Sequence, residues 1–282
     1  MKKLTLTLLI LAFLSNLNAQ KEKVVEEHFR CTRIINLHSV ESLRAGDLEL
    51  KISHRFGQFS SGVNQFWGLD EAQIRIALEY GLTEKFMFGI GRSSQGKIVD
   101  GFMKYKILSQ KEGGLPFSLS YLASTAVSTF PDREDRKRTF TQRLSFANQL
   151  ILSSKLHERL ALQLSPTIVH QNLVKTTEDE NTSVALAISG KYNLTKVVSL
   201  NSEFIPRLSG FDTPSFKENN NSFSVGMGIN TRGHFFEFHL TNSFPMIEQG
   251  FITQTTGKWS DGDIHLGFNI VRDFKIHRPK KK

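Results

Sequence analysis

The chain has 282 residues with 39% apolar content, which is enough for one large domain or two ordinary ones. It contains one cysteine, which excludes a small scaffold held by several disulfides. The formal net charge of +9 is shared between the two chain ends and the body, so it does not by itself indicate a nucleic-acid partner.

Residues 1–19, MKKLTLTLLILAFLSNLNA, have the pattern of a secretory signal peptide: two lysines, a short apolar run and a small residue at Ala19. An uncleaved anchor is the alternative, although the run is short for a spanning helix. Without Lys2 and Lys3 the mature chain carries about +7. Cys31 lies well beyond the apolar run, separated from it by KEKVVEEHFR, so we expect no lipidation.

Residues 20–46 form an N-terminal lead-in before the first expected strand. Its stretch NLHSVES places His38 beside Ser39 with Asn36 nearby, a combination that resembles the Ser–His–Asn chemistry of outer-membrane phospholipases. Adjacent residues of an extended chain point to opposite faces, so the spacing argues against a catalytic pair. We expect no enzymatic activity, and read the segment as a polar lead-in or a plug at the mouth of a barrel.

Alternation with period two dominates residues 47–274 and predicts strands with one apolar and one polar face. No helical period of comparable strength follows the signal. We expect about twelve strands, many of about ten residues, the length of a tilted membrane-crossing strand. They lie near 47–57, 71–80, 86–92, 97–108, 116–127, 139–153, 160–170, 182–192, 198–206, 222–231, 234–242 and 263–272.

The connections between these strands alternate between short and long. Short turns fall near 81–85, 109–115, 154–159, 193–197 and 232–233, and longer polar loops fall near 58–70, 128–138, 171–181, 207–221 and 243–262; the short link near 93–96 is the exception. The stretch YGLTEKFMFGI at Tyr80, echoed from positions 154 and 192, marks short turns. This asymmetry is typical of an outer-membrane barrel with short periplasmic turns and long outer loops.

The polar face favours a membrane barrel over a soluble one. A soluble barrel of twelve strands would enclose a wide interior that apolar side chains fill poorly, whereas a membrane barrel places them against lipid. The expected apolar faces carry no charge, and Arg or Lys facing lipid near the midplane would cost roughly 2–4 kcal/mol. The polar side chains that we expect to face the lumen are Arg75, Glu79, Lys104, Lys106, Arg143, Glu203, Glu237 and His239.

Other motifs have structural explanations. SDGD at 260–263 could hold calcium through Asp261 and Asp263, but Asp-Gly is a common turn former and no bidentate Glu follows at the required spacing. GIGRSSQG lies between two strands and predicts a hairpin, not a phosphate loop. The histidines are scattered over different strands, so we predict neither a metal site nor a cofactor.

The ending DIHLGFNIVRDF resembles the terminal strand of outer-membrane barrels and finishes in Phe274; residues 275–282 continue as a basic tail. Three stretches carry a wider resemblance: TRIINLHSVESLRAGDLELKISHRFG from Thr32, GLDEAQIRIALEYGLTEKFMFGIGRSS from Gly68 and FITQTTGKWSDGDIHLGFNI from Phe251. They resemble a family of exported β-barrel proteins catalogued as domain of unknown function 5777. The resemblance implies an outer-membrane-type barrel and supplies no catalytic motif, ligand or substrate.

The sequence therefore predicts an all-β protein, an antiparallel up-and-down transmembrane β-barrel of the cell outer membrane. Its expected partners are outer-membrane lipid and the chaperones and machinery that assemble barrels. We expect a passive narrow pore or a filled barrel with binding loops. The alternatives are a soluble exported β-domain that binds an apolar ligand and, third, a barrel-embedded lipid hydrolase.

Overall fold

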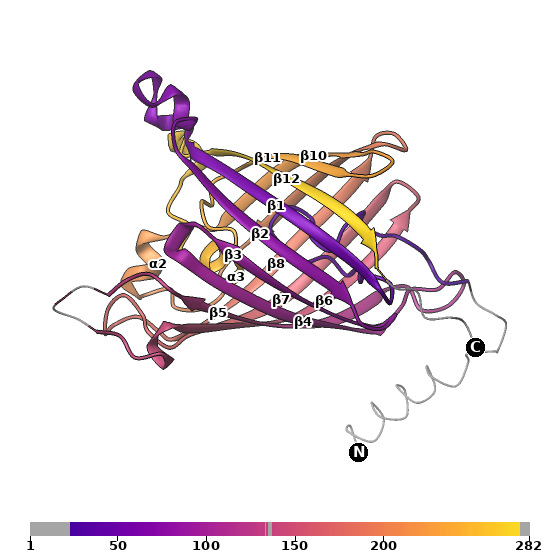
Figure 1. Ribbon diagram of the computed structural model, residues 1–282, viewed down its shortest axis with the longest axis horizontal. Helices are drawn as coiled ribbons and strands as arrows, with labels where there is room; N and C mark the ends of the chain where they lie inside the picture. The colour runs from indigo at the N-terminus through magenta and orange to yellow at the C-terminus, as the bar shows by residue number, and fades with distance from the viewer. Residues whose placement is uncertain (1–22, 133, 135–136, 277–282) are drawn as a thin grey trace, which may run out of the picture.

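The computed structural model describes residues 23–132, 134 and 137–276. Twelve antiparallel strands close into one barrel in which each strand pairs with its sequence neighbours and β1 pairs with β12 (Figure 1). This confirms the predicted up-and-down barrel. The strands are β1 Asp47–Gln58, β2 Ala72–Gly81, β3 Phe86–Ser93, β4 Ile98–Leu108, β5 Ser118–Ser128, β6 Leu144–His157, β7 Leu160–Gln171, β8 Thr182–Asn193, β9 Val198–Ile205, β10 Ser222–Asn230, β11 Phe235–Thr241 and β12 His265–Lys275.

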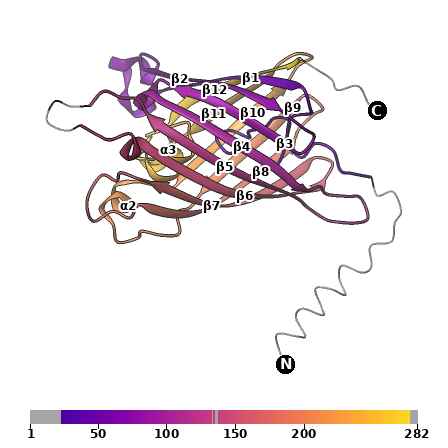
Figure 2. The same cartoon turned by 60° about the horizontal axis from the view of Figure 1, so that its bottom comes forward.

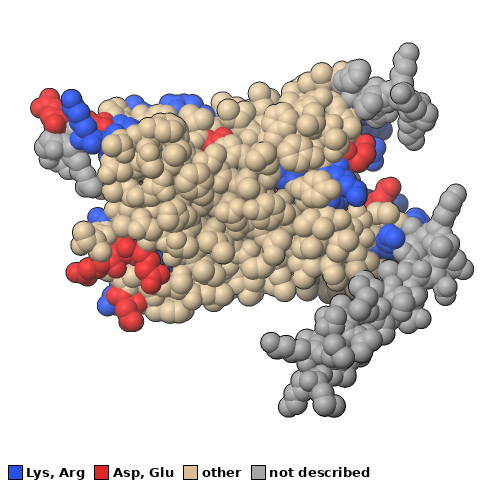
Figure 3. Space-filling model, turned by 90° about the horizontal axis from the view of Figure 1, so that it is seen from below, with Lys and Arg blue, Asp and Glu red and all other residues tan. Residues whose placement is uncertain are grey.

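The predicted alternation is present along the strands. In β2, the side chains of Ile74, Ile76 and Leu78 are exposed, while those of Arg75 and Glu79 between them are buried. Because the barrel is closed, its buried face is the interior, so the polar residues point inward and the apolar residues outward. Seen from one side, most charged side chains gather toward the two ends, with a broad uncharged band between them (Figure 3).

Short turns and long loops lie at opposite ends of the barrel, here called the terminal end and the loop end. The described parts of both chain termini leave the barrel at the terminal end, where the short turns also lie (Figures 1 and 2). The link between β3 and β4 at the loop end is short, as the sequence predicts, and consists of Ser94 and the 3₁₀ turn Gln95–Lys97.

The repeated Leu-Thr pattern marks one specific turn. The hydroxyl of Thr83 accepts hydrogen bonds from the backbone N–H groups of Lys85 and Phe86, and that of Thr195 does the same with Val197 and Val198. A threonine at this position therefore stabilises the reversal through its own side chain. The copy near 154 differs: β6 continues to His157, and the turn is the two-residue link 158–159.

Two further boundaries differ from prediction. β6 begins at Leu144 rather than near 139, because residues 141–143 form the 3₁₀ turn Thr141–Arg143. β12 continues to Lys275, where it pairs with Asp47, so the predicted tail begins one residue too early. Residues 277–282 and the predicted signal peptide, 1–19, lie outside the described residues. Among the described residues, no helix has the length and apolarity needed to cross a membrane.

Two segments enter the barrel from its opposite ends. Residues 28–43, here called the N-terminal plug, enter from the terminal end, and residues 28–40 are almost continuously buried. Residues 242–255, here called the loop plug, belong to the connection between β11 and β12 and carry the short helix α3, Glu248–Thr253. Residues 28–43 of the predicted lead-in 20–46 are therefore a plug, the second of the two readings that the sequence allows, and residues 20–22 lie outside the described residues.

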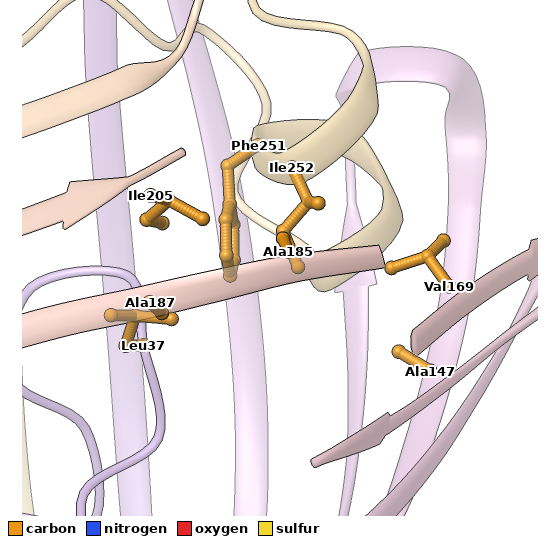
Figure 4. Packing of buried hydrophobic residues seen from close by; sticks show 8 residues of the cluster. All are labelled: Leu37, Ala147, Val169, Ala185, Ala187, Ile205, Phe251 and Ile252. Carbon is orange, nitrogen blue, oxygen red and sulfur yellow. The ribbon is translucent and has the colours of Figure 1, made fainter. Parts of the chain in front are cut away.

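The main apolar cluster joins both plugs to the wall (Figure 4). Phe251 and Ile252 of α3 pack with Leu37 of the N-terminal plug and with small or branched residues of β6 to β9. The wall contributes Ala147, Val169, Ala185, Ala187 and Ile205. Alanines on the inner face leave room for the inserted side chains, so this part of the wall is fitted to a filled interior.

Candidate functional site: the filled lumen

The N-terminal plug is a tight hairpin inside the barrel. Arg33 and His38 form an isolated antiparallel bridge, and the backbone N–H of Ile34 donates to the carbonyl of Leu37 at 2.9 Å. The N–H of Ser39 donates to the carbonyl of Thr32 at 2.9 Å. These bonds leave the N–H groups at the tip without partners in the hairpin itself, so the wall must provide acceptors.

Glu203 of β9 provides those acceptors. Its carboxylate accepts hydrogen bonds from three consecutive backbone N–H groups, those of Ile35 at 2.8 Å, Asn36 at 3.0 Å and Leu37 at 3.0 Å. On the other side of the tip, the Asn269 amide of β12 donates to the carbonyl of Ile35 at 3.0 Å. The tip of the plug is thus fixed by a charged group, whose hydrogen bonds are stronger than those of neutral acceptors.

An ionic cluster holds the middle of the plug. The Lys51 ammonium of β1 lies 3.0 Å from Glu49 and 3.4 Å from Glu79 of β2, and donates to the hydroxyl of Thr32 at 2.8 Å. The Thr32 hydroxyl in turn donates to Glu49 at 2.7 Å. One plug residue is therefore bonded within a cluster of two carboxylates and one ammonium.

Two further wall residues bind the backbone of the plug. Lys104 of β4 donates to the carbonyl of Ser39 at 3.1 Å. Gln163 of β7 accepts from the N–H of Val40 at 3.0 Å and donates to the carbonyl of His38 at 2.8 Å. Lys104 and Gln163, from two separate strands of the wall, thus both bind backbone groups of the same short segment.

The two plugs meet at Glu248, the first residue of α3. Its carboxylate lies 2.9 Å from the guanidinium of Arg33 and 3.3 Å from the His38 ring. Arg55 of β1 also joins them, because its guanidinium donates to the Ser243 carbonyl at 2.6 Å and to the Asn36 side chain at 2.8 Å. All of these side chains are buried, so the contact between the plugs excludes solvent.

The structure places the predicted lumen residues in three settings. Six are buried inside the barrel, each at most 2% exposed: Arg75, Glu79, Lys104, Glu203, Glu237 and His239. Lys106 is half-buried at the terminal end, beside a 490 Å³ cavity. Arg143 lies in the 3₁₀ turn before β6 at the loop end, where it pairs with Asp132 at 2.6 Å.

The buried residues do not form a single group. Glu79 and Lys104 lie at the N-terminal plug, whereas Arg75 pairs with Asp100 of β4 within the wall. Glu237 accepts from the Asn201 side chain at 2.6 Å, and the His239 ring lies 3.1 Å from the Arg55 guanidinium. The interior is a set of local networks that span from wall to wall or from wall to plug.

Sequence reasoning did not assign Arg33, Glu248 or Gln163 to the site. Arg33 and Glu248 lie outside the strands, so the period-two alternation does not tell whether their side chains face the lumen. The run CTRIINLHSV before the first strand could have indicated a buried segment. It contains a single charged residue, whereas an exposed lead-in is expected to carry more charge.

The geometry does not assemble a nucleophile from His38 and Ser39. The Ser39 hydroxyl donates to the carbonyl of Cys31 at 2.5 Å, while the His38 ring packs edge-on against Phe102 and faces Glu248. Both residues are fully buried. Their contacts within the fold are those of structural plug residues.

SDGD at 260–263 forms a turn, with Gly262 in the left-handed conformation at φ 74°. The Asp263 carboxylate accepts from the Ser60 hydroxyl at 2.8 Å, which ties two loops together. In the part of the chain that the structure describes, no group of three or more His, Cys, Asp or Glu side chains could hold a metal ion.

A cavity of 340 Å³ opens at the loop end, here called the vestibule. It lies between the β7–β8 loop, the β9–β10 loop and the end of the loop plug. Arg207 is buried at its edge, stacked on Phe216 at 4.2 Å from the ring centre. The remaining lining combines hydroxyl and amide groups with four charged side chains. The charged residues are Lys175, Asp179, Glu180 and Glu218, and the others include Ser183, Ser209, Thr213, Ser215, Asn219, Thr253, Gln254 and Thr256.

Carboxylates order the loops around this end. Hydrogen bonds from Arg138 hold the pKa of the Asp132 carboxyl below its usual range. Asp179 also has a lowered pKa, because hydrogen bonds from Ser215 and Thr176 outweigh the opposing effect of its partial burial. Both groups are therefore ionised and bonded at neutral pH.

The fold is similar to that of several solved structures. The NanC porin matches with a TM-score of 0.50 at 8% identity, covering 81% of this chain and 99% of that one. The COG4313 outer membrane channel from Pseudomonas putida F1 gives 0.49 at 14% identity, covering 83% and 98%. Outer membrane phospholipase A from Escherichia coli gives 0.43 at 7% identity, covering 92% and 95%. At these identities the likeness concerns the fold alone.

No curated protein matches the sequence. The model of one family, described as a membrane-bound beta barrel domain, matches residues 29–274, which include most of the N-terminal plug and nearly all of the barrel. The chain therefore belongs to the family of membrane-bound beta barrel domains catalogued as domain of unknown function 5777.

Proposed function

We propose that this protein is an outer-membrane barrel that is closed at rest, with its terminal end in the periplasm and its binding surface in the vestibule at the loop end. Membership of a membrane-bound family sets aside the soluble exported β-domain. Short turns on the periplasmic side and long loops outside are the arrangement of outer-membrane barrels.

The observation that carries this proposal is the burial of the inner wall. In an open pore, polar wall residues remain in contact with water, because the lumen is their solvent. Here Lys51, Glu79 and Lys104 are at most 2% exposed and are bonded to the plug or to each other. A filled barrel with binding loops accounts for these contacts better than a passive pore.

The vestibule is the proposed binding surface. Its hydroxyl, amide and charged side chains of both signs offer donors and acceptors to a polar solute. Thr253 and Gln254 of the loop plug form part of the lining, so a bound solute would touch the segment that closes the lumen. The vestibule is therefore in direct contact with the loop plug, one of the two segments that fill the lumen.

Planar-bilayer conductance tests the proposal. The intact protein is expected to show no discrete channel events, whereas a variant with residues 28–41 replaced by a Gly/Ser segment of equal length is expected to conduct. A matched control replaces the exposed turn 231–234, which lies outside the lumen, and should stay silent. Steady channels from the intact protein would contradict closure at rest.

A barrel-embedded lipid hydrolase is not favoured by any contact in the described residues. The Ser39 hydroxyl is buried and donates to a backbone carbonyl. A Ser39→Ala variant is expected to leave phospholipid hydrolysis by the purified protein at the background rate of the intact chain.

A further inference from the structure

The loop between β1 and β2 differs from the other long loops because it exposes a cluster of large apolar side chains in a stretch without charge. From Phe59 to Leu69 the sequence FSSGVNQFWGL contains no charged residue. Its large apolar side chains are between 38% and 70% exposed, namely Phe59, Val63, Phe66, Trp67 and Leu69. We refer to residues 59–69 as the aromatic loop. An apolar cluster of this kind in water is unfavourable unless something covers it.

The loop is held in place by the neighbouring connection. The N–H of Phe59 donates to the carbonyl of Ile264 at 2.8 Å, and the N–H of Ser60 donates to the carbonyl of Gly262 at 3.2 Å. The N–H of Trp67 closes the loop on itself by donating to the carbonyl of Gly62 at 2.8 Å. The aromatic loop is therefore an ordered projection.

Its backbone is strained where the aromatic rings are presented. Phe66 and Trp67 both have left-handed conformations, with φ of 45° and 52°, which bulky side chains rarely adopt. The Trp67 ring lies 5.8 Å from that of Phe66 and 6.5 Å from that of Phe59. Strain of this kind persists where the surrounding structure fixes it, and it often marks a functional surface.

The position of the loop indicates what covers the rings. Figure 1 shows it projecting beyond the ends of β1 and β2, away from the lumen. Four residues, 70–73, join it to the outward row of β2, where Ile74, Ile76 and Leu78 are between 38% and 48% exposed. This row faces lipid in a membrane barrel, so the aromatic loop lies next to the end of the lipid-facing surface.

We infer that the aromatic loop inserts its rings into the outer boundary of the lipid bilayer and anchors the loop end of the barrel there. Phenylalanine and tryptophan favour the interface between headgroups and acyl chains, because an apolar ring and a polar N–H can both be satisfied at that depth. Asp70 and Glu71 follow the apolar stretch and are exposed, so the chain carries charge only where it returns from the loop to the start of β2.

Tryptophan fluorescence tests this inference, since the chain has only two tryptophans. In Trp259→Phe, all emission comes from Trp67. The protein is reconstituted in phosphatidylcholine vesicles whose acyl chains carry bromine close to the glycerol, and separately in vesicles brominated near the chain ends. We expect shallow bromines to quench at least half of the Trp67 emission, deep bromines to quench less, and aqueous iodide to have little effect.

A matched control places the single tryptophan in water at the same end of the barrel. Glu218→Trp in a Trp67→Phe, Trp259→Phe background puts it at the rim of the vestibule. That residue should be quenched by iodide and not by brominated lipid. The heat-dependent shift in gel mobility confirms that each variant is folded before it is measured.

Two outcomes would overturn the inference. Quenching of Trp67 by iodide and not by brominated lipid would place the loop in water. Protection from both quenchers would show that protein covers the rings, as in contact with a second copy of the chain. Neither outcome depends on whether the lumen is closed, so failure here is distinct from failure of the proposed function.

Discussion

The N-terminal plug and the loop plug fill the same lumen but are held by different chemistry. The N-terminal plug is bound mainly through its backbone, by Glu203, Lys104 and Gln163 of the wall. The loop plug is held by Arg55 and by the packing of Phe251 and Ile252 in an apolar cluster. Removing one partner of a buried hydrogen bond costs the desolvation free energy of the group left unpaired. In an apolar cluster, the free-energy cost of a truncation instead grows with the volume of the cavity that remains.

This difference has a consequence for opening the barrel. Every polar group that the wall offers to the N-terminal plug needs another partner once the plug leaves, and water can supply it from the periplasm. The apolar cluster gains nothing from water. We therefore expect the N-terminal plug to be the segment that can be displaced, with the loop plug remaining in place.

The largest expected effect follows from Glu203→Ala. Three buried N–H groups lose their acceptor, each at a cost of roughly 1–3 kcal/mol, so we expect the N-terminal plug to be destabilised by about 4 kcal/mol. Labelling of the Cys31 thiol by a bulky maleimide should accelerate by roughly a thousandfold. Glu203→Gln keeps one acceptor oxygen and should show a smaller acceleration. Equal rates for the intact protein and Glu203→Ala would refute the role assigned to this carboxylate.

Phe251→Ala should act on the other plug. The side chain is fully buried in the apolar cluster, and its loss is expected to cost about 3 kcal/mol through the cavity that remains. Limited proteolysis of folded protein should cleave the 242–264 connection faster, while Cys31 labelling changes much less than in Glu203→Ala. Ile252→Val is the mild control at the same site. If Phe251→Ala released Cys31 as strongly as Glu203→Ala, the two plugs would be one unit.

Glu248→Gln probes the contact between the plugs. We expect it to destabilise the N-terminal plug by about 2 kcal/mol, less than Glu203→Ala, because the amide keeps an acceptor for Arg33 but loses the charge. A double-mutant cycle with Arg33→Gln, read by Cys31 labelling, isolates the pair. Additive effects would show that the ion pair does not couple the plugs.

The smallest expected effect concerns the loop end. The pKa of Asp132 is lowered by its bonds to Arg138 and Arg143, so its stabilising contribution is complete at neutral pH and is lost as the pH falls below the usual range of an aspartate. Cleavage of the β5–β6 loop by an acid-active protease should therefore rise only in strong acid. Asp132→Asn should abolish this pH dependence, and an unchanged pH profile in that variant would contradict the assignment.

The period-two alternation was sufficient to predict the strands and which of their side chains face inward. In a closed membrane barrel every strand has one face toward lipid and one toward the lumen. It predicted Arg75, Glu79 and Glu203 on the inward face, where the structure buries them. It could not show what those residues bind, since the plug hairpin at 32–39 has no periodicity and some of its bonds to the wall, such as those of Glu203 and Gln163, join positions more than a hundred residues apart. The alternation was not sufficient for Arg143, which was expected in the lumen. It lies just before β6, in a 3₁₀ turn where the alternation does not apply.

The most direct measurement uses Cys31, the one cysteine of the chain, which is 4% exposed within the N-terminal plug. Folded protein in bilayers is treated with a polyethylene-glycol maleimide that has access to both sides, and the heat-dependent gel shift confirms that the barrel is intact. A lumen filled by the N-terminal plug predicts negligible labelling until the protein is unfolded by heat. Complete labelling of folded protein, at the rate of a solvent-exposed thiol, would contradict the filled lumen.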